Sequence, residues 1–281
     1  EAALLTHTES ELRALMERFC VSPRRSFGQN FVADPNTVRR IARLSGAGPA
    51  DRVLEIGAGL GSLTLALAET GAAVRAVEVD SGLAAALREV VAEAGARRVE
   101  VVEGDAAALD LDDVLEGSDR WMLVANLPYN IATGLVVDLL HDAAAISVMV
   151  VMVQREVGER LVAPPGSRAR GIPSVLVERQ GTARVVAKVP ASVFRPRPKV
   201  ESVVVRIERH RSADALPMPP EADARFDLLV RTGFGQRRKM LRRSLAGLVG
   251  ADGFAAAGVD PAARPEALSV DQWIRLARTG L

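Results

Sequence analysis

The sequence contains very little cysteine and histidine. Its 281 residues include one cysteine, Cys20, and three histidines, His7, His141 and His210. A single cysteine excludes an internal disulfide framework and a multi-cysteine zinc site. The histidines lack the spacing of metal ligands, so we expect no structural or catalytic metal.

Long apolar runs and lysines are also scarce. No apolar run approaches the 18 residues of a membrane-spanning helix, so we expect no membrane association. The sequence begins Glu1-Ala2-Ala3, without Met or a charged-then-apolar leader, and we expect a processed intracellular protein located in the cytoplasm. Only three of the 36 basic residues are lysines. Genomic base composition is the simplest explanation, although arginine also suits bidentate contact with phosphate.

The chain has enough apolar residues, 48%, for a substantial core. Strand patterns fall near residues 52–56, 74–79, 99–102, 121–125, 147–153, 184–189 and 202–207, and helical patterns near 36–45, 62–70, 82–94, 132–142, 154–163 and 173–180. This alternation predicts a doubly wound α/β domain with a parallel sheet, whose last two strands are joined without a helix and could pair antiparallel. We expect this domain over residues 1–212, with an N-terminal helix and arm over 1–35. Residues 213–281 then form a small helical domain.

Asn126-Leu127-Pro128-Tyr129 is the most informative motif. It follows an apolar run that predicts a buried strand. The Asn126 side-chain oxygen and the Leu127 carbonyl can each accept one hydrogen bond from an exocyclic amine. Pro128 has no N–H to compete, and Tyr129 offers a face on which a base can stack. The simpler alternative is a strand that ends in a proline turn with a buried tyrosine.

Glycines and acids follow the other strands of the predicted sheet. Gly57-Ala58-Gly59-Leu60-Gly61 joins a strand to a helix, as in a nucleotide-binding unit, although Ser62 stands where a dinucleotide fingerprint has its third glycine. Glu78 ends the next strand, where a carboxylate can bind both ribose hydroxyls. Asp105 follows the third strand, and we expect it to meet an adenine amine. Because ligands bind at this edge of open α/β sheets, the sequence predicts an adenosine-containing cofactor.

Taken together, these motifs resemble those of S-adenosylmethionine-dependent adenine N6-methyltransferases. Two further segments narrow the resemblance to the ribosomal RNA adenine dimethyltransferases: Ser26-Phe27-Gly28-Gln29-Asn30-Phe31 and Val193-Phe194-Arg195-Pro196-Arg197-Pro198-Lys199-Val200-Glu201-Ser202. A third segment resembles the C-terminal signature of their small-subunit branch: Gln236-Arg237-Arg238-Lys239-Met240-Leu241-Arg242-Arg243-Ser244-Leu245.

The resemblance implies a Rossmann-like seven-stranded methyltransferase sheet and S-adenosylmethionine as the cofactor. It also implies that Asn30 and Val32 contact the methyl donor and that Phe194 joins Tyr129 in holding a flipped adenine. The substrate it implies is a pair of adjacent adenosines near the 3′ end of 16S rRNA, in the 30S subunit or its precursor. We expect a monomer. Simple core packing is the alternative role for Phe194.

Basic residues are concentrated in the C-terminal part. Residues 191–281 carry a net charge of about +6 and the remainder about −5, which indicates a polyanionic partner. A helix-like run carries Arg237, Arg238, Lys239, Arg242 and Arg243, with Leu241 and Leu245 facing inward. Together with Arg24 and Arg25 of the arm, we expect these basic residues to contact RNA phosphates. A solvated basic face is the simpler alternative.

Other functions remain open at this stage. A nicotinamide-dependent oxidoreductase is disfavoured by Ser62 and by the lack of a proton-relay set. An RNA-binding ribosome assembly factor whose methylation is secondary would carry the same basic residues. A 23S rRNA adenine N6-methyltransferase of the macrolide-resistance type is the nearest alternative, and the C-terminal signature disfavours it.

Overall fold

The computed structural model describes residues 6–24, 28–116, 120–210 and 218–279. The chain divides into two compact units. The first comprises Glu1–Gly158 and Arg184–Arg209, and the second comprises Glu159–Ala183 and His210–Leu281. Within the described ranges, no helix combines the length and the apolar character that crossing a membrane would require.

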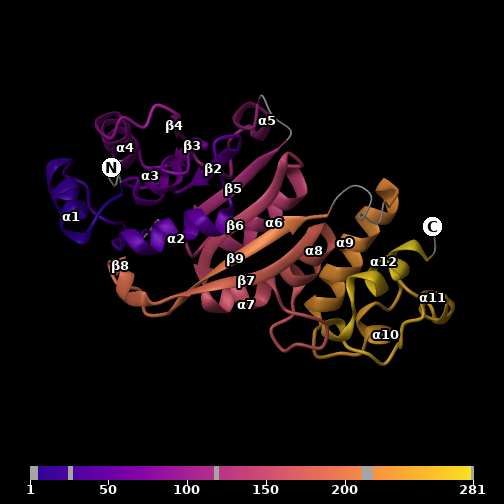
Figure 1. The fold of residues 1–281 in the computed structure, drawn as a ribbon. Helices are drawn as coiled ribbons and strands as arrows, with labels where there is room; N and C mark the ends of the chain where they lie inside the picture. Colours follow the sequence, from indigo (N-terminus) through magenta and orange to yellow (C-terminus); the bar gives the residue numbers. More distant parts are fainter. Residues whose placement is uncertain (1–5, 25–27, 117–119, 211–217, 280–281) are drawn as a thin grey trace. The chain divides into compact units, whose positions relative to one another are not determined.

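A seven-stranded sheet forms the centre of the first unit, in the order β4-β3-β2-β5-β6-β9-β7 (Figure 1). The strands are β2 (Arg52–Ile56), β3 (Ala73–Glu78), β4 (Val99–Glu103), β5 (Trp121–Asn126), β6 (Ile146–Gln154), β7 (Gly181–Val189) and β9 (Ser202–Arg209). Parallel pairing joins β4 to β3, β3 to β2, β2 to β5 and β5 to β6, whereas β9 runs antiparallel to β6. The predicted seven strands and the α/β class are confirmed.

Helices alternate with these strands as predicted. The predicted helices are α2 (Pro35–Ser45), α3 (Ser62–Ala68), α4 (Ser81–Glu93), α6 (Ala132–Asp142) and α7 (Arg155–Leu161), whereas the short α5 (Leu111–Val114) was not predicted. Local sequence sets the ends of α2: the Asp34 carboxylate caps its first turn, Pro35 begins it, and Gly46 ends it in the left-handed conformation.

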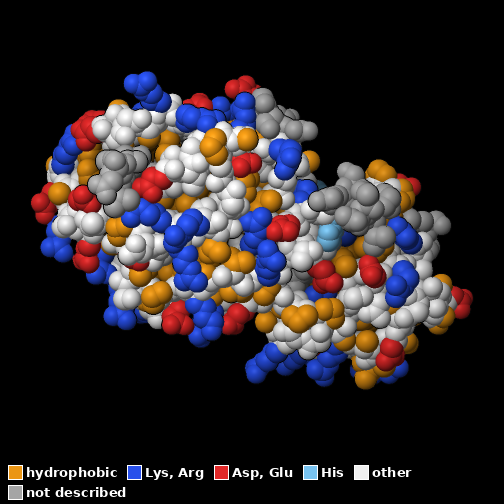
Figure 2. Space-filling model, viewed as in Figure 1, with side chains coloured by type: hydrophobic (Ala, Val, Ile, Leu, Met, Phe, Trp, Pro, Cys, Tyr) orange, Lys and Arg blue, Asp and Glu red, His pale blue; other side chains and the backbone are white. Residues whose placement is uncertain are grey.

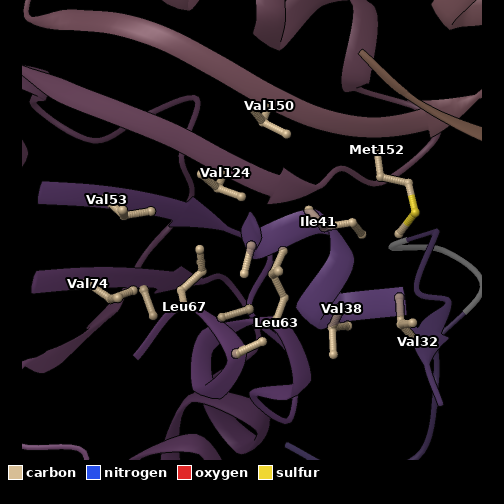
Figure 3. Packing of buried hydrophobic residues seen from close by; sticks show 14 of the residues in the cluster. Val32, Val38, Ile41, Val53, Leu63, Leu67, Val74, Val124, Val150 and Met152 are labelled. Atoms are coloured by element: carbon tan, nitrogen blue, oxygen red, sulfur yellow. The ribbon is translucent and has the colours of Figure 1, made fainter. Parts of the chain in front are cut away.

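The core of the first unit lies between α2, α3 and one face of the sheet. Side chains of the two helices pack beside those of the strands in Figure 3, which labels Val38, Ile41, Leu63, Leu67, Val53, Val74, Val124 and Val150 among others. All eight are buried. Burial of such apolar area, at about 25 cal/mol per Å², provides most of the favourable free energy of folding. The polar groups at the strand ends are therefore anchored to a well-packed hydrophobic core.

The N-terminal helix α1 (Glu9–Arg18) begins at a capping box formed by Thr8 and Glu11. Ion pairs fix both of its ends to other parts of the first unit. Glu9 binds the Arg195 guanidinium with N–O distances of 2.8 and 2.7 Å, and Arg18 binds Glu93. Arg195 belongs to β8 (Phe194–Arg195), which pairs antiparallel with β1 (Phe31–Val32) in a small second sheet. A short 3-10 helix, Ala191–Val193, precedes β8.

The second unit is a helical bundle. It contains α8 (Ile172–Gln180), α9 (Pro220–Gly235), α10 (Leu241–Ser244), α11 (Ala251–Ala257), α12 (Val270–Arg278) and the 3-10 helix Pro265–Ala267. Its core includes Val175 of α8 with Phe226 and Leu229 of α9. This packing places Glu159–Ala183 with the C-terminal helices, whereas the predicted domain boundary at 213 left these residues in the first domain. Residues 213–217, next to that boundary, lie outside the described residues.

The expected helix through the basic run is wrong in its first half. Residues 236–240 form a turn, and α10 starts only at Leu241. Met240 is extended, with ψ of 148°, and the N–H groups of Leu241 and Arg242 donate to the carbonyls of Ala263 and Pro261. These tertiary hydrogen bonds satisfy donors that a continuous helix would have used. The expected burial of Leu241 and Leu245 is confirmed.

Candidate active site

A pocket opens at the carboxyl ends of β2, β3 and β5, and residues 28–32 of the N-terminal arm line its other side. Its empty volume, open solvent included, is about 730 Å³. The predicted site residues that line it are Asn30, Val32, Gly57, Gly59, Glu78, Asn126, Leu127, Pro128 and Tyr129. Residues spread over a hundred positions of sequence thus share one cavity, as the strand-end argument predicts.

The glycine turn after β2 brings main chain to the pocket surface. Gly57 and Gly59 have φ of 75° and 59°, in the left-handed region that side chains disfavour. A Cβ on Gly59 would lie 2.9 Å from Cε1 of Phe31, so there is no room for one. Glycine at this position therefore allows both the turn and the close approach of the arm.

Glu78 is held at the end of β3 by main-chain donors. Its Oε2 accepts from the Gly59 N–H at 2.8 Å and its Oε1 from the Asp80 N–H at 3.0 Å. The side chain is buried, and burial raises the pKa of this carboxyl, although the two N–H groups oppose the rise. A carboxylate has about four lone-pair sites, so both oxygens keep capacity for the hydroxyls of a ribose.

Glu55, on β2, is a site residue that the sequence analysis missed. It lines the pocket, is 2% exposed, and its Oε2 has no hydrogen-bond partner among the described residues. Burial raises the pKa of Glu55 to about 8, and the nearby charge of Glu78 adds to the rise, while the Thr64 hydroxyl opposes it. The available signal was an acid inside an otherwise apolar strand that leads into a glycine turn.

The Asn126 amide has a defined orientation. Its Nδ2 donates to the main-chain oxygen of Asn30 at 3.1 Å, which leaves Oδ1 as the end available to accept from a ligand. The Leu127 N–H donates to the Met152 carbonyl at 3.1 Å, whereas no donor of the described residues takes up the Leu127 carbonyl oxygen. Two acceptors thus stand at the tip of β5.

Tyr129 is fixed by its hydroxyl. The phenol oxygen lies 2.9 Å from Oγ of Ser202, the first residue of β9, which is fully buried. Burial raises the pKa of Tyr129, so the phenol is neutral at physiological pH. Ser202 was not predicted as a site residue, although it belongs to the Phe194-to-Ser202 segment that carries the resemblance.

Two of the predicted catalytic and cofactor-binding residues do not line the pocket. Phe194 is 0% exposed and lies in the hydrophobic core of the first unit, so the structure gives it the packing position that was the alternative. Its expected role beside a flipped base stays a prediction. Asp105 is exposed just beyond β4, and its Oδ1 accepts from the Ala107 N–H at 3.0 Å.

A family comparison separates methyl transfer from hydride transfer. The family model described as "Ribosomal RNA adenine dimethylase" matches residues 21–279. The chain belongs to the ribosomal RNA adenine dimethylase family. It is accordingly an S-adenosylmethionine-dependent methyltransferase, which favours methyl transfer over the hydride transfer of an oxidoreductase.

Curated members of this family are similar over almost their whole length. A protein of Nocardia farcinica named "Ribosomal RNA small subunit methyltransferase A" is 46% identical over 285 residues, covering 99% of this chain and 96% of that protein. Proteins of the same name from Cutibacterium acnes and Mycobacterium tuberculosis are 45% and 43% identical, with 95% and 96% of this chain covered and 92% and 86% of theirs.

Two solved structures have a similar fold. The 23S rRNA methyltransferase ErmE has a TM-score of 0.67 at 28% identity, covering 88% of this chain and 98% of that one. A dimethyladenosine transferase from Plasmodium falciparum has a TM-score of 0.73 at 23% identity, with coverage of 86% and 94%, and this likeness concerns the fold alone.

The pocket fits the cofactor of the dimethylase family. S-adenosylmethionine carries a sulfonium and an ammonium group, so it favours acidic surroundings. The acidic group at the pocket wall is Glu78, which main-chain N–H groups hold in place, whereas Glu55 keeps its proton up to about pH 8 and offers hydrogen-bonding capacity rather than charge. The absence of a side chain at Gly59 leaves main chain at the pocket wall. These groups match a cationic, ribose-containing molecule.

The predicted RNA-contacting residues lie in both units. Arg24 of the arm is exposed and pairs with Asp80 at 3.1 Å, whereas Arg25 lies outside the described residues. Exposed side chains in the second unit are those of Arg238, Lys239, Arg242 and Arg243. Figure 2 shows Lys and Arg side chains along the lower edge of the unit that carries α10.

Arg237 differs from its basic neighbours. Its Nη2 donates to the Arg168 carbonyl at 2.7 Å, and its Nε lies 3.7 Å from Oε2 of Glu266. The Gly166 N–H donates to the Glu266 carbonyl at 2.7 Å in the same region. Arg237 therefore holds the loop of Arg168 against the helical unit, a role that the sequence did not reveal.

Proposed function

We propose that this chain methylates N6 of two adjacent adenosines near the 3′ end of 16S rRNA, giving N6,N6-dimethyladenosine in the 30S subunit or its precursor. It would act as a monomer in the cytoplasm, where that particle is assembled. The observation that carries the proposal is the pair of acceptors, Asn126 Oδ1 and the Leu127 carbonyl, beside the cofactor pocket. The names of the curated relatives support the small ribosomal subunit as the source of the substrate.

The two acceptors would activate the adenine amine. When bound, S-adenosylmethionine supplies an electrophilic methyl group on a sulfonium. Asn126 and Leu127 accept hydrogen bonds from the two N6 hydrogens, which favours a pyramidal nitrogen whose lone pair is free to attack. The same oxygens stabilise the positive charge that grows on N6, and they are in place before the reaction. The N6-methylated cation is acidic enough to lose its proton to water, so no general base is required.

The remaining residues of the motif would hold the base. Tyr129, anchored through Ser202, offers its ring for stacking, which is worth about 1–3 kcal/mol per base. Because Asn126 is neutral, the site tolerates the loss of one N6 hydrogen after the first transfer and allows a second. An adenine reaches such a pocket only from a single strand or after flipping out of a helix.

Mass spectrometry of rRNA nucleosides tests the proposal. Undermethylated 30S particles are incubated with the donor and with wild type, Asn126→Ala or Asn36→Ala, the last being a matched change of an exposed asparagine on α2. We expect N6,N6-dimethyladenosine with wild type and Asn36→Ala, and at least a 100-fold slower reaction with Asn126→Ala. Absence of the product with wild type, or its formation by Asn126→Ala at the normal rate, would refute the proposal.

Substrates from the large subunit test the nearest alternative. The similarity to the 23S rRNA methyltransferase ErmE makes this comparison necessary. We expect no product when protein-free 23S rRNA replaces the 30S particle. Preferred methylation of 23S rRNA would replace the proposal by the macrolide-resistance activity. Normal 30S maturation in cells that carry only Asn126→Ala would show that assembly, rather than methylation, is the main role.

We also propose that Arg24, Arg238, Lys239, Arg242 and Arg243 contact RNA phosphates. Each phosphate contact that is lost should reduce the slope of log affinity against log salt by about one. Arg242→Ala should therefore weaken 30S binding and flatten its salt dependence. Arg97→Ala removes an exposed arginine of the first unit and is the control, for which we expect no change. An unchanged slope in Arg242→Ala would remove this residue from the interface.

A further inference from the structure

The amide of Asn126 and the main chain of Asn30 form a contact across 96 positions of sequence. The donor is Nδ2 of Asn126 and the acceptor is the Asn30 carbonyl oxygen, 3.1 Å away. A carbonyl oxygen can only accept, so the amide must turn its NH2 group towards the arm and its oxygen away from it. The arm therefore decides which end of the amide is offered to a ligand.

The Asn30 carbonyl is itself held in place. On one side, the Asn30 Nδ2 donates to the Gly28 carbonyl at 3.0 Å. On the other side, Phe31 pairs with Arg195 in the small sheet, and the Ala33 N–H donates to the Val193 carbonyl at 2.8 Å. The carbonyl thus belongs to a braced segment, and the direction in which it points does not depend on a bound base.

We propose that the Asn30 carbonyl is a positioning group that orients the Asn126 amide for the adenine, so that this site requires an amide and rejects a carboxylate at position 126. The proposal rests on the methyl-transfer function given above. A carboxylate at this position would place a charged oxygen about 3 Å from the carbonyl oxygen, with no proton between them. Only the protonated carboxyl could donate to Asn30 and still turn an oxygen towards the base.

The surroundings of position 126 favour that protonated form. The titratable side chains that line the same pocket are Glu55 of β2, Glu78 of β3 and Tyr129 of the adjoining loop. The arm contributes the neutral side chains of Gln29 and Asn30. None of these protein groups is a cation that would stabilise a carboxylate, and the sulfonium of bound S-adenosylmethionine is the charge that opposes this preference. Asn126→Asp should therefore be active only where the introduced carboxyl keeps its proton.

Single-turnover methylation of undermethylated 30S particles between pH 5.5 and 8.5 tests the inference. Four proteins are compared: wild type, Asn126→Asp, Asn126→Ala and Asn36→Asp. We expect the rate of Asn126→Asp, relative to wild type, to be highest at pH 5.5 and to fall up to tenfold per pH unit once the introduced carboxyl ionises. Asn126→Ala should stay at its basal rate at every pH, and Asn36→Asp should follow wild type.

Two outcomes would overturn the positioning role of Asn30. One is a ratio of the Asn126→Asp rate to the wild-type rate that stays constant across the pH range, whether the ratio is high or low. The other is a ratio that rises with pH, which would mean that the carboxylate is the active form. Failure of wild type to methylate the particle would instead refute the proposed function, so the two failures are distinguishable.

A measurement without substrate provides a second readout. The pKa of the introduced carboxyl is determined by carbon NMR in selectively labelled protein, with wild type used to identify the additional signal. We expect this pKa to lie well above the value of about 3.9 found in peptides, because the Asn30 carbonyl accepts only from the protonated form. A pKa at or below that value would contradict the proposal even if the variant were inactive.

Discussion

Replacing Glu55 by glutamine should remove a large pH dependence of stability from the first unit. Glu55 is buried beneath the cofactor pocket, and its Oε2 lacks a hydrogen-bond partner among the described residues. Glutamine has nearly the same shape and carries no proton that titrates. The variant therefore changes the charge state of the site while its packing stays the same.

The magnitude follows from the pKa of Glu55, which burial raises from 4.5 to about 8. Between these values the folded protein keeps a proton that the unfolded chain has lost. The free energy of unfolding must then fall as the pH rises, by up to about 1.4 kcal/mol per pH unit. The stability that depends on this proton is fully present below pH 4.5 and is lost as the pH approaches 8. Between pH 5.5 and 7.5, wild type should lose about 2–3 kcal/mol relative to Glu55→Gln.

Urea unfolding followed by tryptophan fluorescence measures this difference. Trp121 lies in the first unit and Trp273 in the second, so a Trp273→Phe background makes the signal specific for the unit that contains Glu55. Glu17→Gln, the same chemical change on the exposed face of α1, is the control and should run parallel to wild type. If the free energy of unfolding of Glu55→Gln changes with pH in the same way as that of wild type, Glu55 is already ionised in the folded protein and the reasoning is wrong.

Three further variants test other parts of the structure. Gly59→Ala requires an alanine in the left-handed conformation, which costs about 1–2 kcal/mol, and its Cβ would clash with Phe31. Calorimetry should therefore show at least tenfold weaker binding of S-adenosylhomocysteine. Arg170→Ala removes a fully buried guanidinium that pairs with the partly exposed Glu178 and donates to the Ala163 and Leu268 carbonyls, so it should destabilise the second unit by about 3 kcal/mol in urea unfolding. Ser202→Ala leaves the Tyr129 hydroxyl without its anchor, so KM for 30S particles should rise severalfold with little change in kcat, and Tyr129→Phe should add no further loss.

Much of the first unit was predictable because its signals are local. Apolar runs bounded by glycine and polar residues located all seven strands of the large sheet to within three residues. The rule that ligands bind at the carboxyl ends of parallel strands then brought Gly57, Glu78 and Asn126 to one pocket.

The features that the sequence predicted wrongly or missed depend on contacts between distant segments. The helix in the basic run starts only at Leu241, where the N–H groups of Leu241 and Arg242 donate to the carbonyls of Ala263 and Pro261, and no local pattern records these contacts. Arg237 belongs to the same basic run as its exposed neighbours, but its contacts with the Arg168 carbonyl and Glu266 give it a structural role.

The sequence by itself determined the chemistry at the tip of β5: an amide, a carbonyl freed by proline and an aromatic ring, in that order. Only the tertiary structure decided how the Asn126 amide is turned, that Oε2 of Glu55 is buried without a hydrogen-bond partner among the described residues, and that Phe194 packs in the core. The physical reason is that residue type and spacing fix which groups each segment carries. The orientation and protonation of those groups depend on neighbours that packing brings from elsewhere in the chain.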